Sequence, residues 1–313
     1  MVNPNEWPGS TFPGLWTDRY DASDELERRV HLGMIEAEDR HLYESFIALG
    51  FAVIPNAVPT ALCQALSDEI HHAWKEGGSS FLSQSPGSQK LIPVTSDLDP
   101  KSMRIVDAHV ASHATREILF SPRITKFLRE IFAEQPLLFQ SLTFERGSEQ
   151  GFHQDTAYVV VDEPRKLAAA WVALEDVRAG SGELRYIPRS HRIPEFLFSG
   201  EFKHWSPERD GHDQHEEWNN HLITTAQQME LAEERFLPKM GDVLVWAADL
   251  IHGGSPVESN DLTRRSLVGH YCPASSRPNY FEFAPQQSNI VEHGEGRYSS
   301  YHFQINPSPL SGA

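Results

Sequence analysis

Two short polar segments that lie far apart in the sequence must meet in space, and this requirement constrains the fold more than any other feature. The first segment holds His153 and Asp155, and the second holds His252, about a hundred residues later. In an extended segment residues i and i+2 point to the same side, so His153 and Asp155 can reach one ion while Gln154 faces away. Two imidazoles and one carboxylate hold a ferrous ion by one face and leave three coordination positions open. The pattern therefore indicates a mononuclear iron site.

The residues that follow add an anion-binding group. His252 ends the apolar run 243–251, which reads as a buried strand. Arg264 and Ser266 lie on the next candidate strand, where two-residue alternation turns both side chains to one side. A guanidinium offers a planar fork to a carboxylate and a hydroxyl adds one donor, which suits the far end of a dicarboxylate such as 2-oxoglutarate. Alternation alone does not decide whether Arg264 or Arg265 faces outward, so a surface ion pair for Arg264 stays open. The combination points to an oxygenase.

On these motifs the sequence resembles the phytanoyl-CoA dioxygenase family of Fe(II)/2-oxoglutarate oxygenases. The resemblance covers most of the chain and rests on motifs that occur in family order, at residues 46–56, 151–156, 170–176, 180–191 and 250–266. It implies a mainly β fold, with a double-stranded β-helix (jelly-roll or cupin-like) core and flanking N-terminal α-helices.

The resemblance also implies roles for individual residues. His153, Asp155 and His252 would be the catalytic metal ligands, and Arg264, assisted by Ser266, would bind the distal carboxylate of 2-oxoglutarate. Further co-substrate contacts would come from a set of polar and aromatic residues: Gln150, Gln140, Thr143 and Trp171. The last three are equally open to interpretation as plain strand residues. Relatives carry a lysine where this chain has Arg146, which leaves that contact open.

The implied reaction uses Fe(II), 2-oxoglutarate as co-substrate and O2. It would oxidise an unactivated C–H bond of a small organic metabolite, with hydroxylation as the favoured outcome. Succinate and CO2 would be released. Halogenases on this scaffold replace the carboxylate ligand by a small residue, so Asp155 favours hydroxylation or a related oxidation over halogenation. Two alternatives stay open: a zinc-type hydrolase or isomerase on the same triad, which leaves Arg264 and Ser266 unexplained, and a non-catalytic metal or 2-oxoglutarate sensor.

Composition excludes several other classes of protein. The net charge of -17 argues against nucleic acid, because phosphate binding needs a basic surface. No apolar run approaches the length that crosses a bilayer, and residues 1–5 lack the features of a secretion signal. The two cysteines, Cys63 and Cys272, suggest no disulfide framework. We therefore expect a cytoplasmic enzyme with a small-molecule substrate, whose oligomeric state the sequence does not indicate.

We expect residues 1–313 to form one catalytic domain. Its expected parts are an N-terminal arm and helix at 1–45, a core at 46–275, an inserted loop at 201–221 and a C-terminal extension at 276–313. Periodicity predicts helices at 23–49, 59–76 and 123–132, a loop at 79–99, and mostly strands from 136 onward.

Some residues near these motifs have two interpretations. The inserted loop carries four histidines, His204, His212, His215 and His221, whose spacing matches no familiar zinc pattern, so an exposed lid is favoured over a second metal site. Tyr158 could contact substrate or simply pack. His270 is expected to be a satisfied core histidine, and His191 to brace a loop.

Overall fold

The computed structural model describes residues 10–77, 80–88 and 90–305. In this part of the chain the main sheet is mostly antiparallel and runs in the order β1-β9-β6-β11-β5-β4-β2-β3, with β12 and β13 attached beside β5. A smaller sheet runs in the order β10-β7-β8. The strands are β1 (Phe51–Ile54), β2 (Leu82–Gln84), β3 (Leu91–Pro93), β4 (Arg104–Val106), β5 (Pro136–Phe144), β6 (Ala168–Ala173), β7 (Leu184–Tyr186), β8 (Glu234–Arg235), β9 (Val243–Ala247), β10 (His252–Gly254), β11 (Ser266–Pro273), β12 (Val291–His293) and β13 (Gly296–Tyr298).

The main sheet has an outer face that helices cover and an inner face that forms the site. Alternate residues of a strand point to opposite faces, so Thr143 of β5 shares the outer face with its cross-strand partners Ile105 and Leu267. Those two partners belong to the largest hydrophobic cluster, together with residues of the N-terminal helices. On the inner face, Trp171 and Val268 pack with residues of β7. The smaller sheet thus covers part of the inner face.

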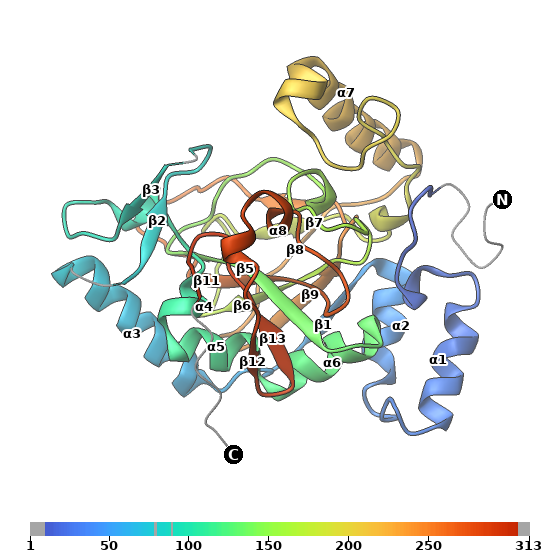
Figure 1. Ribbon diagram of the computed structural model, residues 1–313, viewed down its shortest axis with the longest axis horizontal. Helices are drawn as coiled ribbons and strands as arrows, with labels where there is room; N and C mark the ends of the chain where they lie inside the picture. The colour runs from blue at the N-terminus through green and yellow to red at the C-terminus, as the bar shows by residue number, and fades with distance from the viewer. Residues whose placement is uncertain (1–9, 78–79, 89, 306–313) are drawn as a thin grey trace.

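Most helices lie along one side of the main sheet (Figure 1). The view shows α1 to α6 along the bottom and sides of the sheet, while α7 stands apart at the top. The helices are α1 (Ala22–His31), α2 (Arg40–Leu49), α3 (Thr60–Glu76), α4 (Ala108–Ala111), α5 (His113–Leu119), α6 (Pro122–Phe132), α7 (Pro207–Gln228) and α8 (Tyr280–Phe283), with 3-10 turns η1 (Trp16–Asp18), η2 (Pro100–Ser102), η3 (Asp155–Ala157), η4 (Ser190–Arg192) and η5 (Pro285–Gln287).

Helix α6 shows how the sequence forms this layer. Pro122 occupies the start of the helix, where a missing N–H costs nothing. Ile124, Phe127 and Leu128 recur at helical spacing and are buried. The ring of Phe127 stacks on Tyr43 of α2 at 4.8 Å between centroids. Burying a side chain of this size stabilises the fold by about 1.5–3 kcal/mol.

Two of the three predicted helices are confirmed and one is wrong. The helices expected at 59–76 and 123–132 correspond to α3 and α6. The helix expected at 23–49 is instead α1 and α2, because the chain turns after His31 and Gly33 adopts a left-handed φ of 69°. A residue in that conformation ends a right-handed helix. The short helices α4 and α5 were not predicted.

Two loops expected from composition contain regular structure. The described part of 79–99 forms the hairpin β2–β3, in which Ser83 pairs with Ile92; positions 79 and 89 lie outside the described residues. The insertion expected at 201–221 is largely helix α7, because Trp218, Leu222 and Ala226 form a buried stripe at helical spacing. Gly211 interrupts this helix with a φ of 66°.

The strand expected over the apolar run 243–251 is shorter than predicted. Strand β9 ends at Ala247, and a turn follows in which the N–H of Leu250 donates to the carbonyl of Ala247. The chain then enters β10 in the smaller sheet, so His252 comes from a different sheet from the run that precedes it.

No helix in the described ranges is long and apolar enough to cross a membrane. Residues 1–9 of the expected N-terminal arm and 306–313 of the expected C-terminal extension lie outside the described part of the chain. The assignment of 1–313 to one catalytic domain stays a prediction.

Candidate metal centre

The backbones of two predicted ligands are bonded directly to each other. His153 and His252 form an isolated antiparallel bridge. The N–H of His153 donates to the carbonyl of His252 at 2.9 Å, and the reverse bond measures 3.0 Å. The ring centroids lie 4.3 Å apart. The expected extended segment is limited to this bridge, because Asp155 already begins the 3-10 turn η3.

The side chains of the three predicted ligands converge on one point. Asp155 Oδ1 lies 3.9 Å from His153 Nε2 and 3.6 Å from His252 Nε2. One ligand atom from each of the three residues lies within 4.8 Å of the others, and all three residues are buried. Ligands of one ion lie about 2 Å from it, so atoms at these separations fit a single small cation.

Other groups orient these side chains. His153 Nδ1 lies 2.9 Å from the carbonyl oxygen of Gly151, and His252 Nδ1 lies 3.0 Å from that of Leu250. Because a carbonyl only accepts, each Nδ1 carries the proton and each Nε2 lone pair is free for a metal. Trp246 Nε1 donates to Asp155 Oδ2 at 2.7 Å, which leaves Oδ1 facing the histidines.

The protonation states suit a metal-binding set. Burial, followed by the nearby His252, lowers the pKa of His153 to about 3, so this imidazole is neutral at ordinary pH. Burial acts to raise the pKa of Asp155, but the adjacent His252 and His270 outweigh it, and the net shift is downward. Metal ligands of these types bind as neutral imidazole and carboxylate.

A cavity of about 140 Å³ connects this centre to Arg264. The Arg264 side chain is buried, with 3% exposed, and no carboxylate in the described residues lies within ion-pair distance of its guanidinium. The guanidinium lies near the rings of Phe144 and Trp171, at 5.6 and 5.5 Å, and its Nε has no hydrogen-bond partner in the part of the chain that the structure describes. Burial lowers the pKa of Arg264 to about 10. A buried cation without a counter-ion costs free energy, and a bound carboxylate would remove that cost.

The family model for phytanoyl-CoA dioxygenase (PhyH) matches residues 48–266 of the chain. The chain belongs to the phytanoyl-CoA dioxygenase family. A curated mouse relative, phytanoyl-CoA dioxygenase domain-containing protein 1, is 28% identical over 87 residues, or 26% of this chain and 30% of the relative. The rat protein of the same name gives the same coverage and identity. The aligned part thus spans less than a third of these curated relatives.

Solved structures share the fold. The epimerase SnoN from nogalamycin biosynthesis, in complex with Fe3+, α-ketoglutarate and nogalamycin RO, aligns with a TM-score of 0.61 at 17% identity, over 85% of this chain and 99% of that chain. EctD from S. alaskensis, with 2-oxoglutarate and 5-hydroxyectoine, aligns with a TM-score of 0.56 at 17% identity, over 78% of each chain. The expected cupin-like core with flanking helices is confirmed, although the main sheet does not close into a barrel.

Within this member of the dioxygenase family, the cavity brings together most of the predicted co-substrate residues. Gln140, Gln150 and Trp171 line it with the triad and Arg264. Ser266 is fully buried next to that wall, on the same face of β11 as Val268, and its Oγ has no hydrogen-bond partner among residues 10–77, 80–88 and 90–305.

The structure places Thr143 outside the cavity, contrary to the expected co-substrate contact. The residues of β5 that line the cavity are Gln140, Leu142 and Phe144, so alternation turns Thr143 to the outer face. There it lies between Ile105 and Leu267 of the neighbouring strands, on the face turned away from the cavity. Thr143 and Gln140 are three positions apart, an odd spacing that places them on opposite faces of a regular strand.

The structure shows which of Arg264 and Arg265 faces outward. Arg265 faces outward and pairs with Glu145 at 2.9 Å, while Arg264 faces the cavity. Arg146, the position where relatives carry lysine, pairs with Glu149 at 3.2 Å and is absent from the cavity wall.

Sequence reasoning missed or misjudged two residues beside the metal ligands. The apolar run around Trp246 gave no sign that its indole N–H binds Asp155. His270 was expected to be a satisfied core histidine, but it lines the cavity and its Nε2 lies 3.7 Å from Asp155 Oδ2. Its Nδ1 has no hydrogen-bond partner within the described ranges. Even spacing from Ser266 along β11 was the available signal for its direction.

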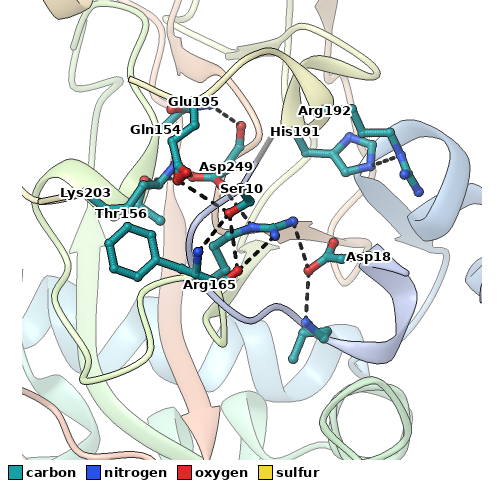
Figure 2. Close-up of polar contacts among 12 residues, drawn as sticks. Ser10, Asp18, Gln154, Thr156, Arg165, His191, Arg192, Glu195, Lys203 and Asp249 are labelled. Carbon is teal, nitrogen blue, oxygen red and sulfur yellow. Dashed lines mark hydrogen bonds and ion pairs between the residues drawn. The ribbon is translucent and has the colours of Figure 1, made fainter. Parts of the chain in front are cut away.

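A buried ionic network includes residues that neighbour the ligands in the sequence, among them Thr156 and Asp249 (Figure 2). Asp249 accepts from Thr156 Oγ1 at 2.8 Å and pairs with Lys203 at 2.9 Å and Arg165 at 3.5 Å. Its backbone carbonyl accepts from the side chain of Gln154 at 2.7 Å. The residues beside Asp155 are therefore tied to the segment that leads to His252. As expected, His191 braces a loop, through a contact of 3.3 Å between its Nε2 and the carbonyl of Ile47.

The insertion touches the site through Tyr158. This side chain lines the cavity, and its hydroxyl lies 2.6 Å from His215 Nε2 on α7. His221 contacts the carbonyl of Pro194 at 2.8 Å. Among the described residues, the metal-binding group found is the triad.

Proposed function

We propose that this protein is an Fe(II)- and 2-oxoglutarate-dependent dioxygenase that hydroxylates a C–H bond of a small organic molecule. In the balanced reaction, substrate, O2 and 2-oxoglutarate yield hydroxylated substrate, succinate and CO2. One observation carries the proposal: the convergent His153, Asp155 and His252 share a cavity with Arg264, a buried guanidinium that forms no ion pair with the carboxylates of the described residues.

The residues of the chain divide the work between two sites in this cavity. His153, Asp155 and His252 would hold iron(II), and Arg264, with Ser266 behind it, would hold the distal carboxylate of 2-oxoglutarate. Iron and 2-oxoglutarate, when bound, supply the activation of O2 and the two electrons that the reaction needs. Gln140 and Gln150 would orient the co-substrate, and Trp171 limits the space around the guanidinium. The apolar wall that includes Leu142 and Val268 excludes water.

A zinc-dependent hydrolase or isomerase on the same triad accounts less well for the site. It would need a metal-bound water but no dicarboxylate, so Arg264 would remain a buried cation without a partner. A sensor that binds 2-oxoglutarate without turnover would use the same contacts, and only product formation separates it from an oxygenase. A cytoplasmic location and a small-molecule substrate stay predictions.

The test is succinate formation by iron-loaded protein with 2-oxoglutarate and O2, over a panel of small organic substrates. We compare wild type with His153→Ala, Arg264→Met and Arg265→Met. We expect no succinate from His153→Ala. For Arg264→Met, loss of a charge-assisted pair worth about 2–4 kcal/mol raises the 2-oxoglutarate concentration for half-maximal rate by roughly 30-fold or more.

Arg265→Met is the matched control. Arg265 is the next residue in the chain and faces outward, so the substitution removes the same charge outside the cavity. Its 2-oxoglutarate requirement should equal that of wild type. If wild type binds metal yet forms no more succinate than His153→Ala under any condition, the oxygenase proposal fails. If Arg265→Met and Arg264→Met behave alike, the assignment of Arg264 fails.

A further inference from the structure

A larger cavity adjoins the metal centre, and we call it the outer chamber. It encloses about 500 Å³ and shares Gln140, Gln150, Tyr158 and Val159 with the cavity that holds the ligands. Sites for small organic molecules typically enclose about 300–1,000 Å³. Because the two cavities share these walls, a molecule in the outer chamber lies next to the cavity that the metal ligands line.

Aromatic side chains form much of the wall of the outer chamber. Tyr158, Trp205 and Tyr280 contribute rings, as do Phe283 and Tyr301, which lie 5.8 Å apart between centroids. Three of these side chains are unusually exposed for large rings: 62% for Phe283, 42% for Tyr158 and 37% for Tyr301. Exposed rings that gather in one concave site commonly mark a binding surface for an apolar or planar ligand.

Arg104 in the wall of the chamber is a cation that has no counter-ion among the described residues. Nε and Nη2 of Arg104 donate to Gln84 Oε1 at 3.0 and 2.5 Å, and Nη1 has no partner among the described residues. No carboxylate in the described ranges lies within ion-pair distance of this guanidinium, and no described wall residue is acidic. The chain as a whole has a net charge of -17. A wall with an arginine and no acid therefore stands out against the rest of the molecule.

The register of the sheet places Arg104 on the same face as a residue that lines the metal cavity. Gln84, Arg104 and Phe144 are cross-strand partners on β2, β4 and β5, so they share the inner face. Phe144 lines the metal cavity, and Arg104 lines the outer chamber. A ligand that spans the chamber can therefore contact Arg104 while its far end reaches the metal cavity.

We propose that the outer chamber binds the primary substrate, and that this substrate is a planar aromatic molecule with a carboxylate that Arg104 recognises. The assignment rests on the proposed oxygenase function of the neighbouring site. The aromatic walls hold the ring system, and Gln84 fixes the guanidinium so that Nη1 faces the acid. Arg104 and Arg264 thus divide two carboxylates between them, with substrate at the first and co-substrate at the second.

The experiment measures binding by calorimetry to anaerobic, iron- and 2-oxoglutarate-loaded protein, so turnover plays no part. The probes are naphthalene-2-carboxylate, its carboxamide, which has nearly the same shape but no charge, and cyclohexanecarboxylate, which has the charge but no aromatic ring. Wild type should bind the aromatic acid about tenfold or more tightly than either of the other two, as expected for a charge-assisted pair. Arg104→Met should reduce the preference for the acid over the amide to near one.

Two further variants keep the result interpretable. Arg104→Lys retains the charge and should retain part of the preference, which separates recognition from a folding defect. Arg178→Met removes an equal charge from an exposed position outside the chamber and should bind like wild type.

Several outcomes would overturn the assignment. They are equal binding of acid and amide by wild type, a preference that survives Arg104→Met, equal binding of the aromatic and aliphatic acids, and binding of no probe. Retained acid preference together with absent succinate formation would count against the proposed reaction alone. Retained succinate formation without acid preference would count against the outer-chamber assignment alone.

Discussion

Single residues set the chemistry of the centre through groups that can only donate or only accept. The carbonyls of Gly151 and Leu250 only accept, so they fix the tautomers of the two histidines. The indole of Trp246 only donates, so it selects which oxygen of Asp155 is left for a metal. These contacts determine ligand direction before any ion is present.

We predict that Trp246→Phe weakens metal binding while preserving the fold. The substitution keeps an aromatic ring in the sheet but removes the hydrogen bond to Asp155 Oδ2. Loss of such a partner typically lowers metal affinity by about 10–100-fold. Competition with a chelator would measure the affinity, and Trp171→Phe serves as control because Trp171 contacts Arg264 and no metal ligand. Equal affinities for Trp246→Phe and wild type would contradict the role of the indole.

A buried histidine away from the metal should make stability depend on pH. Burial, followed by the nearby Arg192, lowers the pKa of His191 to about 3. The unfolded chain binds this proton near pH 6.5, so the contribution of His191 to stability is present above that pH and is lost as pH falls toward 3. By pH 5.5 the loss should reach about 1.4 kcal/mol. Urea unfolding at pH 7.5 and 5.5 should therefore show a smaller pH effect for His191→Gln than for wild type, and an unchanged pH effect would contradict the prediction.

Sequence patterns identified residues whose type and spacing both carry chemistry, and failed where three-dimensional direction decides. His153, Asp155 and His252 were found because their types are uncommon together, and the structure brings them to one point. Trp246 was missed because an aromatic residue in an apolar run reads as core. His270 was misjudged because a histidine on a strand has the same signal whether its ring nitrogens have partners or not.

At the scale of elements, strand alternation decides which side chains reach the site. We predict that Thr143→Val leaves 2-oxoglutarate affinity unchanged, because Thr143 faces the helices. Its buried hydroxyl has no hydrogen-bond partner among the residues described, so its removal should leave stability unchanged or raise it by up to about 1 kcal/mol. Gln140→Leu on the cavity face of the same strand should weaken the affinity. Calorimetry with 2-oxoglutarate would test the pair, and weakened binding by Thr143→Val would contradict the assignment of faces.

Local sequence was a poor guide to elements whose stability comes from tertiary contacts. Helix α7 is rich in polar residues and histidine, yet Trp218 and Leu222 are almost fully buried against Phe198 and Ile251. The split between α1 and α2 depends on the single left-handed residue Gly33. By contrast, α3 and α6 carry clear start or stop signals, and these were predicted within a residue.

At the scale of the whole molecule, Asp249 joins segments that are distant in sequence. Arg165, which pairs with Asp249, also pairs with Asp18 of the N-terminal region at 3.4 Å. Lys203, the other partner of Asp249, lies in the insertion that carries α7. Burial acts to raise the pKa of Asp249, but Lys203 and Arg165 outweigh it, and the net shift is downward. One carboxylate therefore holds three parts of the fold beside the metal ligands.

We predict that Asp249→Ala destabilises the protein by about 3–5 kcal/mol, because it removes the carboxylate that pairs with the buried Lys203 and one of the two carboxylates that pair with Arg165. Lys239→Met is the contrasting control. Lys239 pairs with Asp176 at 3.0 Å on the surface, and loss of such a pair should cost less than about 1 kcal/mol. Denaturant unfolding would measure both, and similar small losses would show that the Asp249 network contributes little.

The reciprocal backbone bonds between His153 and His252 have a consequence for how the protein handles its metal. Closing a loop of about a hundred residues costs roughly 4–5 kcal/mol of chain entropy. In this protein the folding of the two sheets already brings the ligands together. Metal binding therefore does not have to offset this entropy cost. Metal uptake and loss should therefore proceed without folding or unfolding of the chain. The apoprotein should keep its fold through repeated cycles of iron removal and return.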